Sequence, residues 1–177
     1  MGGSNESEPL RLLWAGTFSI RKGAHLLLKA WQDWEPGSRV QLDVFGSNQL
    51  PDGLLKSLPE EIRFHAPVAR KDIMCVMESS DLLVFPTLYD GFGMVVTEAL
   101  SRGLPVLTTP CAGACSFIRH RENGLIIQED SETELAEALK WCLNNKKLCK
   151  QMRPLAVRSA QDWQWPDYRK ALIKAID

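Results

Sequence analysis

The sequence predicts an α/β domain in which a mostly parallel, six-stranded sheet carries helices on both faces. Short apolar runs typical of buried strands alternate with longer segments whose apolar residues recur at the helical period. Strands and helices that alternate in this way form βαβ units, and these units build a parallel sheet. A length of 177 residues suits one domain with a sizeable core.

Each element is predicted from its own pattern. Strands are expected where runs are short and either apolar or alternating: residues 10–15, 40–45, 62–65, 81–85, 105–108 and 124–127. Helices are expected at residues 23–34, 52–57, 70–79, 93–102, 115–120, 131–145, 147–160 and 166–176. Ser131 and Glu134 form a capping box at the start of one of them. We expect residues 1–9 to be a flexible tail or an expression remnant and residues 10–177 to be the domain.

Composition excludes several classes of protein. The hydrophobic content of 45%, charged content of 24% and net charge of −1 are typical of a globular domain. Because 21 basic residues nearly balance 22 acidic ones, we expect no nucleic-acid partner. No apolar run reaches the ~18 residues of a membrane span, and no signal-peptide core precedes the domain. We therefore expect a cytoplasmic protein.

The cysteines and histidines do not predict a metal centre. Five cysteines without framework spacing indicate free thiols in a reducing compartment. Cys111 and Cys115 have the separation of metal ligands, but no second Cys/His pair accompanies them. His25, His65 and His120 are scattered along the chain. We expect small loop residues at the two cysteines rather than metal ligands.

The most informative segment is residues 86–100, which follows a predicted buried strand and opens a helix. Asp90 and Glu98 flank Gly91 and Gly93 at the turn. Free N–H groups and the positive end of the helix dipole favour an anion such as a diphosphate, and glycines permit its close approach. The charge of Glu98, in an otherwise apolar helix, requires a partner. A nucleotide-sugar fits this layout, because its sugar and ribose lie on opposite sides of a diphosphate.

The turn after the first strand carries the complementary charge. Arg21 and Lys22 directly precede a predicted helix, at the end where the dipole favours negative charge. An isolated pair of this kind is more often a solvated basic loop. This pair, however, shares the ligand-binding edge of the predicted sheet with the glycine turn, so we interpret it as a phosphate site.

Two other nucleotide or phosphate functions fit poorly. The first turn lacks the G-x-G-x-x-G spacing of NAD-binding domains, and residues 45–47 contain no acid for a ribose. A phospho-receiver needs clustered acids at the strand ends, where this chain has Gly16 and Thr17. For the turns at residues 46–48, 108–110 and 113–114 two interpretations remain: they contact the ligand, or their small and polar residues serve only to form the turn.

Three motifs together resemble a known family: Arg21-Lys22-Gly23, Asp90-x7-Glu98 and Gly103-Leu104-Pro105-Val106. They are similar to the C-terminal, donor-binding half of family 4 retaining glycosyltransferases, which have two Rossmann-like domains in the GT-B architecture. The resemblance covers residues 10–177 and implies a single Rossmann-like domain. Trp165-x-x-Tyr168 resembles the family's final helix, which crosses back to the N-terminal domain, and Trp163 lies on the same docking segment.

The resemblance implies roles for the matching residues. Lys22 neutralises the diphosphate with Arg21, Asp90 holds the transferred sugar, and Glu98 accepts hydrogen bonds from the ribose, so Lys22, Asp90 and Glu98 are the expected catalytic residues. The expected donor contacts are Gly16, Thr17, Arg21, Lys22, Ala66, Pro67, Val68, Asp90, Gly91, Phe92, Gly93, Met94, Val95 and Glu98. Residues 66–68 pack on the base. Two positions depart from the family: Asp90 is commonly Glu, and Thr17 is often an Arg, for which Arg21 compensates.

The implied activity is transfer of a hexose, with retention, from a nucleoside diphosphate sugar to an acceptor hydroxyl, in polysaccharide or glycolipid biosynthesis. We expect no cofactor and no metal, because cations and the helix dipole stabilise the leaving diphosphate. In the family, an N-terminal domain binds the acceptor saccharide or lipid, so this chain is expected to bind donor without full activity. Peripheral association of the full-length enzyme with the inner membrane face is a further expectation.

The alternative is a stand-alone, non-catalytic nucleotide-sugar-binding or interaction module. A genuine start at Met1 would favour the module, and an encoded acceptor domain upstream would favour part of an enzyme. The expression-like residues Met1-Gly2-Gly3-Ser4 favour the enzyme.

Overall fold

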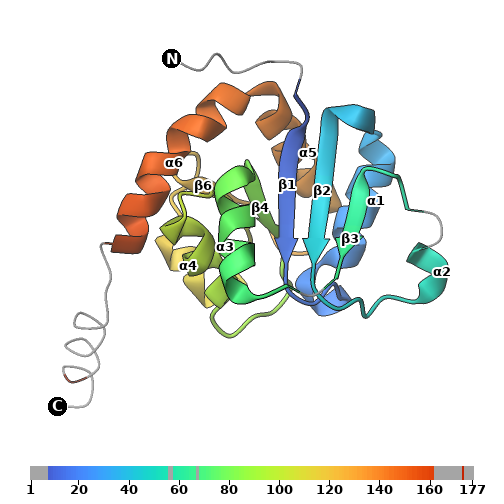
Figure 1. The fold of residues 1–177 in the computed structure, drawn as a ribbon, viewed down its shortest axis with the longest axis horizontal. Coiled ribbons are helices and arrows are strands. Elements are labelled where there is room, and N and C mark those ends of the chain that lie inside the picture. The colour runs from blue at the N-terminus through green and yellow to red at the C-terminus, as the bar shows by residue number, and fades with distance from the viewer. Residues whose placement is uncertain (1–7, 56–57, 67, 162–172, 174–177) are drawn as a thin grey trace.

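The computed structural model describes residues 8–55, 58–66, 68–161 and 173. Its centre is a six-stranded sheet with the order β3-β2-β1-β4-β5-β6, and every neighbouring pair is parallel (Figure 1). The strands are β1 (Leu10–Ala15), β2 (Val40–Phe45), β3 (Ile62–His65), β4 (Leu82–Phe85), β5 (Val106–Thr108) and β6 (Gly124–Ile126). The predicted fold class, a single α/β Rossmann-like domain, is confirmed.

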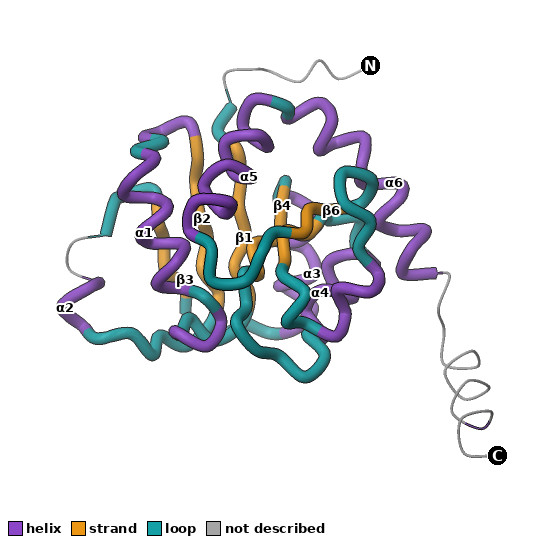
Figure 2. The backbone as a smooth tube through the Cα atoms, turned by 180° about the vertical axis from the view of Figure 1, so that it is seen from behind, coloured by secondary structure: helices purple, strands orange, loops and turns teal. Residues whose placement is uncertain are grey.

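Helices cover both faces of the sheet. They are α1 (Ala24–Trp34), α2 (Asp52–Leu55), α3 (Arg70–Ser79), α4 (Met94–Ser101), α5 (Glu132–Asn144) and α6 (Lys146–Gln161). Short 3₁₀ turns are η1 (Ile20–Lys22), η2 (Gly37–Arg39) and η3 (Gly113–Phe117). Figure 1 shows α3 and α4 in front of the sheet, and Figure 2, from behind, shows α1 and α5 on the other face.

The core has two parts, one on each face, because successive side chains of a strand point to opposite sides. Leu12 packs with α1 and α5, whereas the adjacent Leu13 packs with α3, α4 and α6. Strand β4 is buried along its whole length, since it lies between β1 and β5 with helices on both sides. The sheet is therefore a rigid support for the loops at its ends.

One predicted helix is wrong in extent. Residues 115–120 were expected to be helical, but the structure has the 3₁₀ turn η3 at Gly113–Phe117, and Ile118 is extended. The buried Asn123 explains the difference: its side chain donates to the Phe117 carbonyl (2.8 Å) and accepts from the Arg119 N–H (2.7 Å). These side-chain bonds replace the bonds that a continued helix would make.

Some predictions fall outside the described residues. They are the helix at residues 166–176 except residue 173, residues 56–57 of the helix predicted at 52–57, the docking residues Trp163, Trp165 and Tyr168, the base-contact residue Pro67, and the tail up to residue 7. All five cysteines are described, and their thiols are free, as predicted. Among the described residues, no helix is both long and apolar enough to cross a membrane.

Candidate functional site

The candidate site lies at the carboxyl ends of β1 and β4, the neighbouring strands at the centre of the sheet. The chain runs from β1 outward to β2 and β3 on one side, and from β4 to β5 and β6 on the other. This change of direction opens a crevice between the loops that follow the two central strands. Residues 16–23 and 86–93 form these loops.

Backbone contacts hold the two loops together. The Arg21 carbonyl accepts from the Leu88 N–H at 3.0 Å and from the Thr87 hydroxyl at 3.3 Å. The Arg21 guanidinium donates to the Tyr89 carbonyl at 3.0 Å. Gly23 permits this approach: its φ is +82°, and a Cβ there would lie 2.0 Å from the Pro86 carbonyl oxygen. The basic turn and the glycine turn are therefore one packed unit.

Lys22 and Asp90 form an ion pair across these loops, although they are 68 positions apart. Their side chains are only 15% and 16% exposed. The Lys22 ammonium also lies 4.8 Å from the centroid of the Phe85 ring, within the range of a cation–π contact. Burial, and secondarily the positive charge of Arg21, lowers the pKa of Lys22. The structure thus brings together two of the three expected catalytic side chains.

The glycine turn is braced by the segment after β5. The Asp90 carboxylate accepts from the Phe92 N–H at 3.2 Å, and the Asp90 N–H donates to the Cys111 carbonyl at 3.0 Å. Gly113 packs so closely that a Cβ would lie 2.7 Å from the Gly91 carbonyl oxygen. This brace fixes the orientation of Asp90. Residues 111–113 thus support the glycine turn rather than line the crevice.

Helix α4 begins at the floor of the crevice. Gly93 caps it with φ +84°, and its first turn contains no acidic residue. The first N–H groups of a helix have no partner within the helix and carry the positive end of its dipole. Met94 and Val95 supply these groups, and both line the crevice.

The crevice has a volume of about 550 Å³. It is lined by Trp14, Ala15, Gly16, Thr17, Arg21, Lys22, Phe85, Asp90, Gly91, Phe92, Gly93, Met94 and Val95. Ten of these residues, all except Trp14, Ala15 and Phe85, are among the predicted donor contacts. We call this cavity the upper cleft, although the carboxyl ends of the strands, where it lies, point downward in the view of Figure 1.

Glu98, Ala66 and Val68 do not line the upper cleft. Glu98 lies three residues beyond Val95 and four beyond Met94, so it continues the same face of α4. Its Oε1 accepts from Arg70 Nη2 at 2.5 Å. Ala66 and Val68 are exposed after β3, which is separated from β1 by β2. The expected ribose and base contacts thus lie outside the lining of the cleft, and we refer to the surface at Glu98, Ala66 and Val68 as its open extension.

Sequence reasoning missed two pairs near this extension. One is Arg70 with Glu98. The other is His65 with Asp43: the His65 Nε2 lies 2.6 Å from Asp43 Oδ1, and its ring stacks on Phe45 with centroids 4.3 Å apart. In the parallel pairing of β2 with β3, Phe45 lies opposite His65. The sequence could have revealed this pair only if the order of the strands in the sheet had been predicted.

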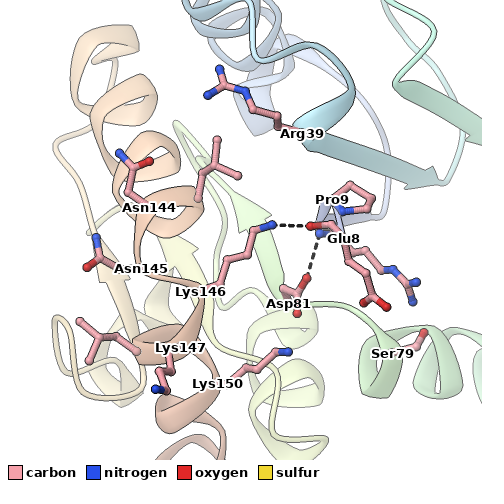
Figure 3. A pocket seen from close by; sticks show the side chains of 13 residues that line it. Glu8, Pro9, Arg39, Ser79, Asp81, Asn144, Asn145, Lys146, Lys147 and Lys150 are labelled. Carbon is pink, nitrogen blue, oxygen red and sulfur yellow. Dashed lines mark hydrogen bonds between the residues drawn. The ribbon is translucent and has the colours of Figure 1, made fainter. Parts of the chain in front are cut away.

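A second cavity, of about 670 Å³, lies at the opposite end of the sheet (Figure 3). We call it the basal cavity; it is lined by Glu8, Pro9, Arg11, Arg39, Ser79, Asp81, Leu143, Asn144, Asn145, Lys146, Lys147, Leu148 and Lys150. Its central polar groups already have protein partners. Lys146 donates to the Glu8 carbonyl, and the Asp81 carboxylate accepts from the Arg11 N–H at 2.9 Å.

Within the residues that the structure describes, no group of three or more His, Cys, Asp or Glu side chains is arranged to hold a metal ion. Cys111 and Cys115 are therefore two thiols without further ligands of this kind around them. Burial raises the pKa of the Cys115 thiol, and the nearby Cys111 adds to this effect. Both groups belong to the segment that supports the glycine turn.

Comparison with known proteins gives concordant results. A family model described as glycosyl transferases group 1 matches residues 3–157. An uncharacterized glycosyltransferase of Haemophilus influenzae is 28% identical over 163 residues, which cover 86% of this chain and 44% of that protein. The chain spans 36–44% of the length of this and two further relatives that it matches.

Two solved structures share the fold. The C-terminal domain of LpcC, a glycosyl transferase group 1 family protein of Francisella tularensis, has a TM-score of 0.77 and 18% identity. The alignment covers 89% of this chain and 88% of that one. HepE of Anabaena, in complex with UDP, has a TM-score of 0.77 at 20% identity, over 97% of this chain and 49% of that one.

Proposed function

Because the chain belongs to the glycosyl transferases group 1 family and has the fold of a GT-B C-terminal domain, we propose that it binds the nucleotide-sugar donor of a retaining glycosyltransferase. The enzyme would transfer the sugar of a nucleoside diphosphate sugar to an acceptor hydroxyl. One observation carries the proposal: the upper cleft brings Lys22 and Arg21 to Asp90 and to the start of α4.

The upper cleft suits a diphosphate. Its volume of about 550 Å³ is in the usual range for a small-molecule site. Lys22 and Arg21 provide two positive charges on one side, and the N–H groups of Met94 and Val95 provide donors on the other. Arg21 and Lys22 precede α1, where the helix dipole disfavours positive charge. An anion bound between these two cations and the start of α4 would remove this unfavourable interaction.

The ion pair of Lys22 with Asp90 gives the proposal a specific consequence. A diphosphate competes with Asp90 for the Lys22 ammonium. Once Lys22 turns to the phosphates, the Asp90 carboxylate is left as an acceptor for sugar hydroxyls, while its bond from Phe92 keeps it oriented. Recognition of the diphosphate and of the sugar are thereby coupled through one side chain.

The chemical task is to stabilise the charge that develops on the leaving diphosphate. Arg21 and the start of α4 are preorganised for it, because the packed loops hold them before any ligand binds, and Lys22 adds its charge once it exchanges Asp90 for the phosphates. The positive charge comes from side chains and backbone, so the proposed mechanism requires no metal and no cofactor. The transferred sugar, with oxocarbenium character, would lie over Asp90 and the glycine turn.

The nucleoside would lie on the open extension of the cleft, with its ribose at Glu98 and its base near residues 66–68. UDP-type donors are the first to test, because HepE, which has the same fold, is described in complexes with UDP and with UDP-glucose. The identity of the base in this chain is set by the region around Ala66 and Val68.

The whole protein is proposed to be a cytoplasmic enzyme that associates peripherally with a membrane surface. Its relatives are more than twice as long as the matched region, so the remaining part would bind the acceptor, a saccharide or a lipid. The 177-residue chain alone should then bind donor and transfer no sugar. A chain that binds donor and never transfers, even with its neighbouring domain, would instead be a binding module.

Isothermal titration calorimetry with UDP, GDP, ADP and their glucose conjugates tests the proposal. We expect one nucleoside diphosphate to bind with clear preference, and inorganic sulfate to compete poorly. Absence of binding by every nucleotide at millimolar concentration would contradict the proposed function. A thermal-shift panel with the same ligands gives an independent readout, since a ligand that binds only the folded state raises Tm.

A further inference from the structure

We propose that Arg70 is a specificity residue that, together with Glu98, selects a ribonucleotide over a deoxyribonucleotide. This inference rests on the proposed function, because it assigns the ribose of the donor to Glu98. Arg70 is the first residue of α3, directly after the segment expected to hold the base. Its Nη2 donates to Glu98 Oε1 at 2.5 Å, which connects the start of α3 to the middle of α4.

The arginine is unfavourable where it stands unless it has an anionic partner. It occupies the first turn of α3, where the helix dipole repels positive charge; Asp72 in the same turn favours the dipole, but the preceding residue, Ala69, provides no side-chain cap. Its side chain is 73% exposed, and ion pairs of such exposure contribute little to stability. Its position is therefore better explained by what it does for Glu98.

Glu98 retains the capacity to bind a ligand while Arg70 holds it. Among the residues that the structure describes, Arg70 is the only hydrogen-bond partner of the Glu98 carboxylate, and it uses one oxygen. An ionised carboxylate accepts about four hydrogen bonds, so acceptor sites remain on both oxygens. Arg70 in turn retains guanidinium N–H groups that point to solvent, because most of its side chain is exposed.

A ribose diol matches this pair of side chains. Each hydroxyl can donate to Glu98 and accept from Arg70, because a hydroxyl has one O–H and two lone pairs. A 2′-deoxyribose loses one such bridge and leaves part of the pair without its partner. Sites built to bond a substrate hydroxyl discriminate strongly against the analogue that lacks it.

The chain offers a matched control. Arg102 bonds Glu78 at 3.1 Å, so a second Arg–Glu pair joins the residue that follows α4 to the last turn of α3. Each pair has an exposed arginine and links α3 to α4 or to the residue directly after it. Arg102→Ala thus reproduces the loss of a surface ion pair without touching Glu98.

The experiment compares three ligands by calorimetry: the nucleoside diphosphate that the wild type prefers, its 2′-deoxy counterpart, and inorganic pyrophosphate. Arg70→Ala should weaken binding of the ribonucleotide by roughly 5- to 10-fold and lower the ratio of ribo to deoxy affinity severalfold, while the remaining acceptor sites of Glu98 keep that ratio above one. Pyrophosphate affinity should stay unchanged, because it has no ribose. Arg70→Lys should keep an intermediate ratio, and Arg102→Ala should resemble the wild type.

Two results would overturn the inference while the proposed function stands. One is an unchanged ribo-to-deoxy ratio in Arg70→Ala. The other is an equal loss of affinity for pyrophosphate, which would indicate a general charge effect. If the wild type binds pyrophosphate but no nucleotide, the proposed function fails as well, so the two failures are distinguishable.

Discussion

The upper cleft and the basal cavity lie at opposite ends of the same sheet and differ little in size, about 550 against 670 Å³. Both contain cations beside the start of a helix. In the upper cleft, Lys22 and Asp90 are largely buried and converge on a braced glycine turn. In the basal cavity, Lys147 and Lys150 are exposed, and its central groups are already bonded to the backbone. Neither the volume of a cavity nor its positive charge, then, identifies a binding site. The upper cleft differs from the basal cavity because its paired side chains, Lys22 and Asp90, are largely buried and meet at one braced turn.

The upper cleft depends on close contact between its two loops, and Gly23 is where that contact is tightest. Gly23→Ala should reduce the free energy of unfolding by about 3 kcal/mol or more, because the new Cβ meets the Pro86 carbonyl and φ is positive. Gly37→Ala is the control: its φ is +56° but the space around it is open, so it should cost only about 1 kcal/mol. Urea denaturation measures both. An equal decrease in the free energy of unfolding for both variants would show that the loops move apart around the new Cβ at position 23 without loss of stability.

A pair of lysine substitutions compares the two cavities directly. Lys22→Ala should weaken nucleoside diphosphate binding by roughly 1.5–3 kcal/mol, the value of a charge-assisted hydrogen bond. Lys150→Ala removes the same charge from the basal cavity and should change the affinity little. Calorimetry at constant ionic strength distinguishes the two. Equal weakening by both substitutions would mean that the total charge of the protein, not the upper cleft, attracts the nucleotide.

If Lys22 exchanges Asp90 for the diphosphate, removing the Asp90 charge should increase the affinity for the diphosphate, an effect smaller than the two above. Asp90→Asn removes the carboxylate that competes for Lys22, so affinity for the free nucleoside diphosphate should rise, by up to about 1 kcal/mol. The affinity that the sugar adds to the free diphosphate should fall in the same variant, because an amide accepts fewer hydrogen bonds from sugar hydroxyls than a carboxylate does. Asp81→Asn in the basal cavity should change neither quantity. A fall in diphosphate affinity in Asp90→Asn would disprove the exchange.

Local sequence patterns predicted much of the molecule. Strands β1, β2 and β3 have the expected bounds, because period-two and apolar runs flanked by glycine or polar residues are local signals. The placement of Lys22 and Asp90 at one edge of the sheet also followed from the sequence, since each follows a strand of a parallel sheet. The extent of η3 did not, because it is set by side-chain bonds of the buried Asn123 to the backbone of the same loop.

By itself, the sequence determined the fold class, the elements and the turn chemistry that makes a diphosphate site plausible at one edge. Only the tertiary structure decided which distant side chains meet: Lys22 with Asp90, 68 positions apart, and Arg70 with Glu98, 28 positions apart. The physical reason is that periodicity and turn preferences are properties of neighbouring residues. Contacts between distant segments depend instead on the strand order and on how closely the loops pack once the core has formed.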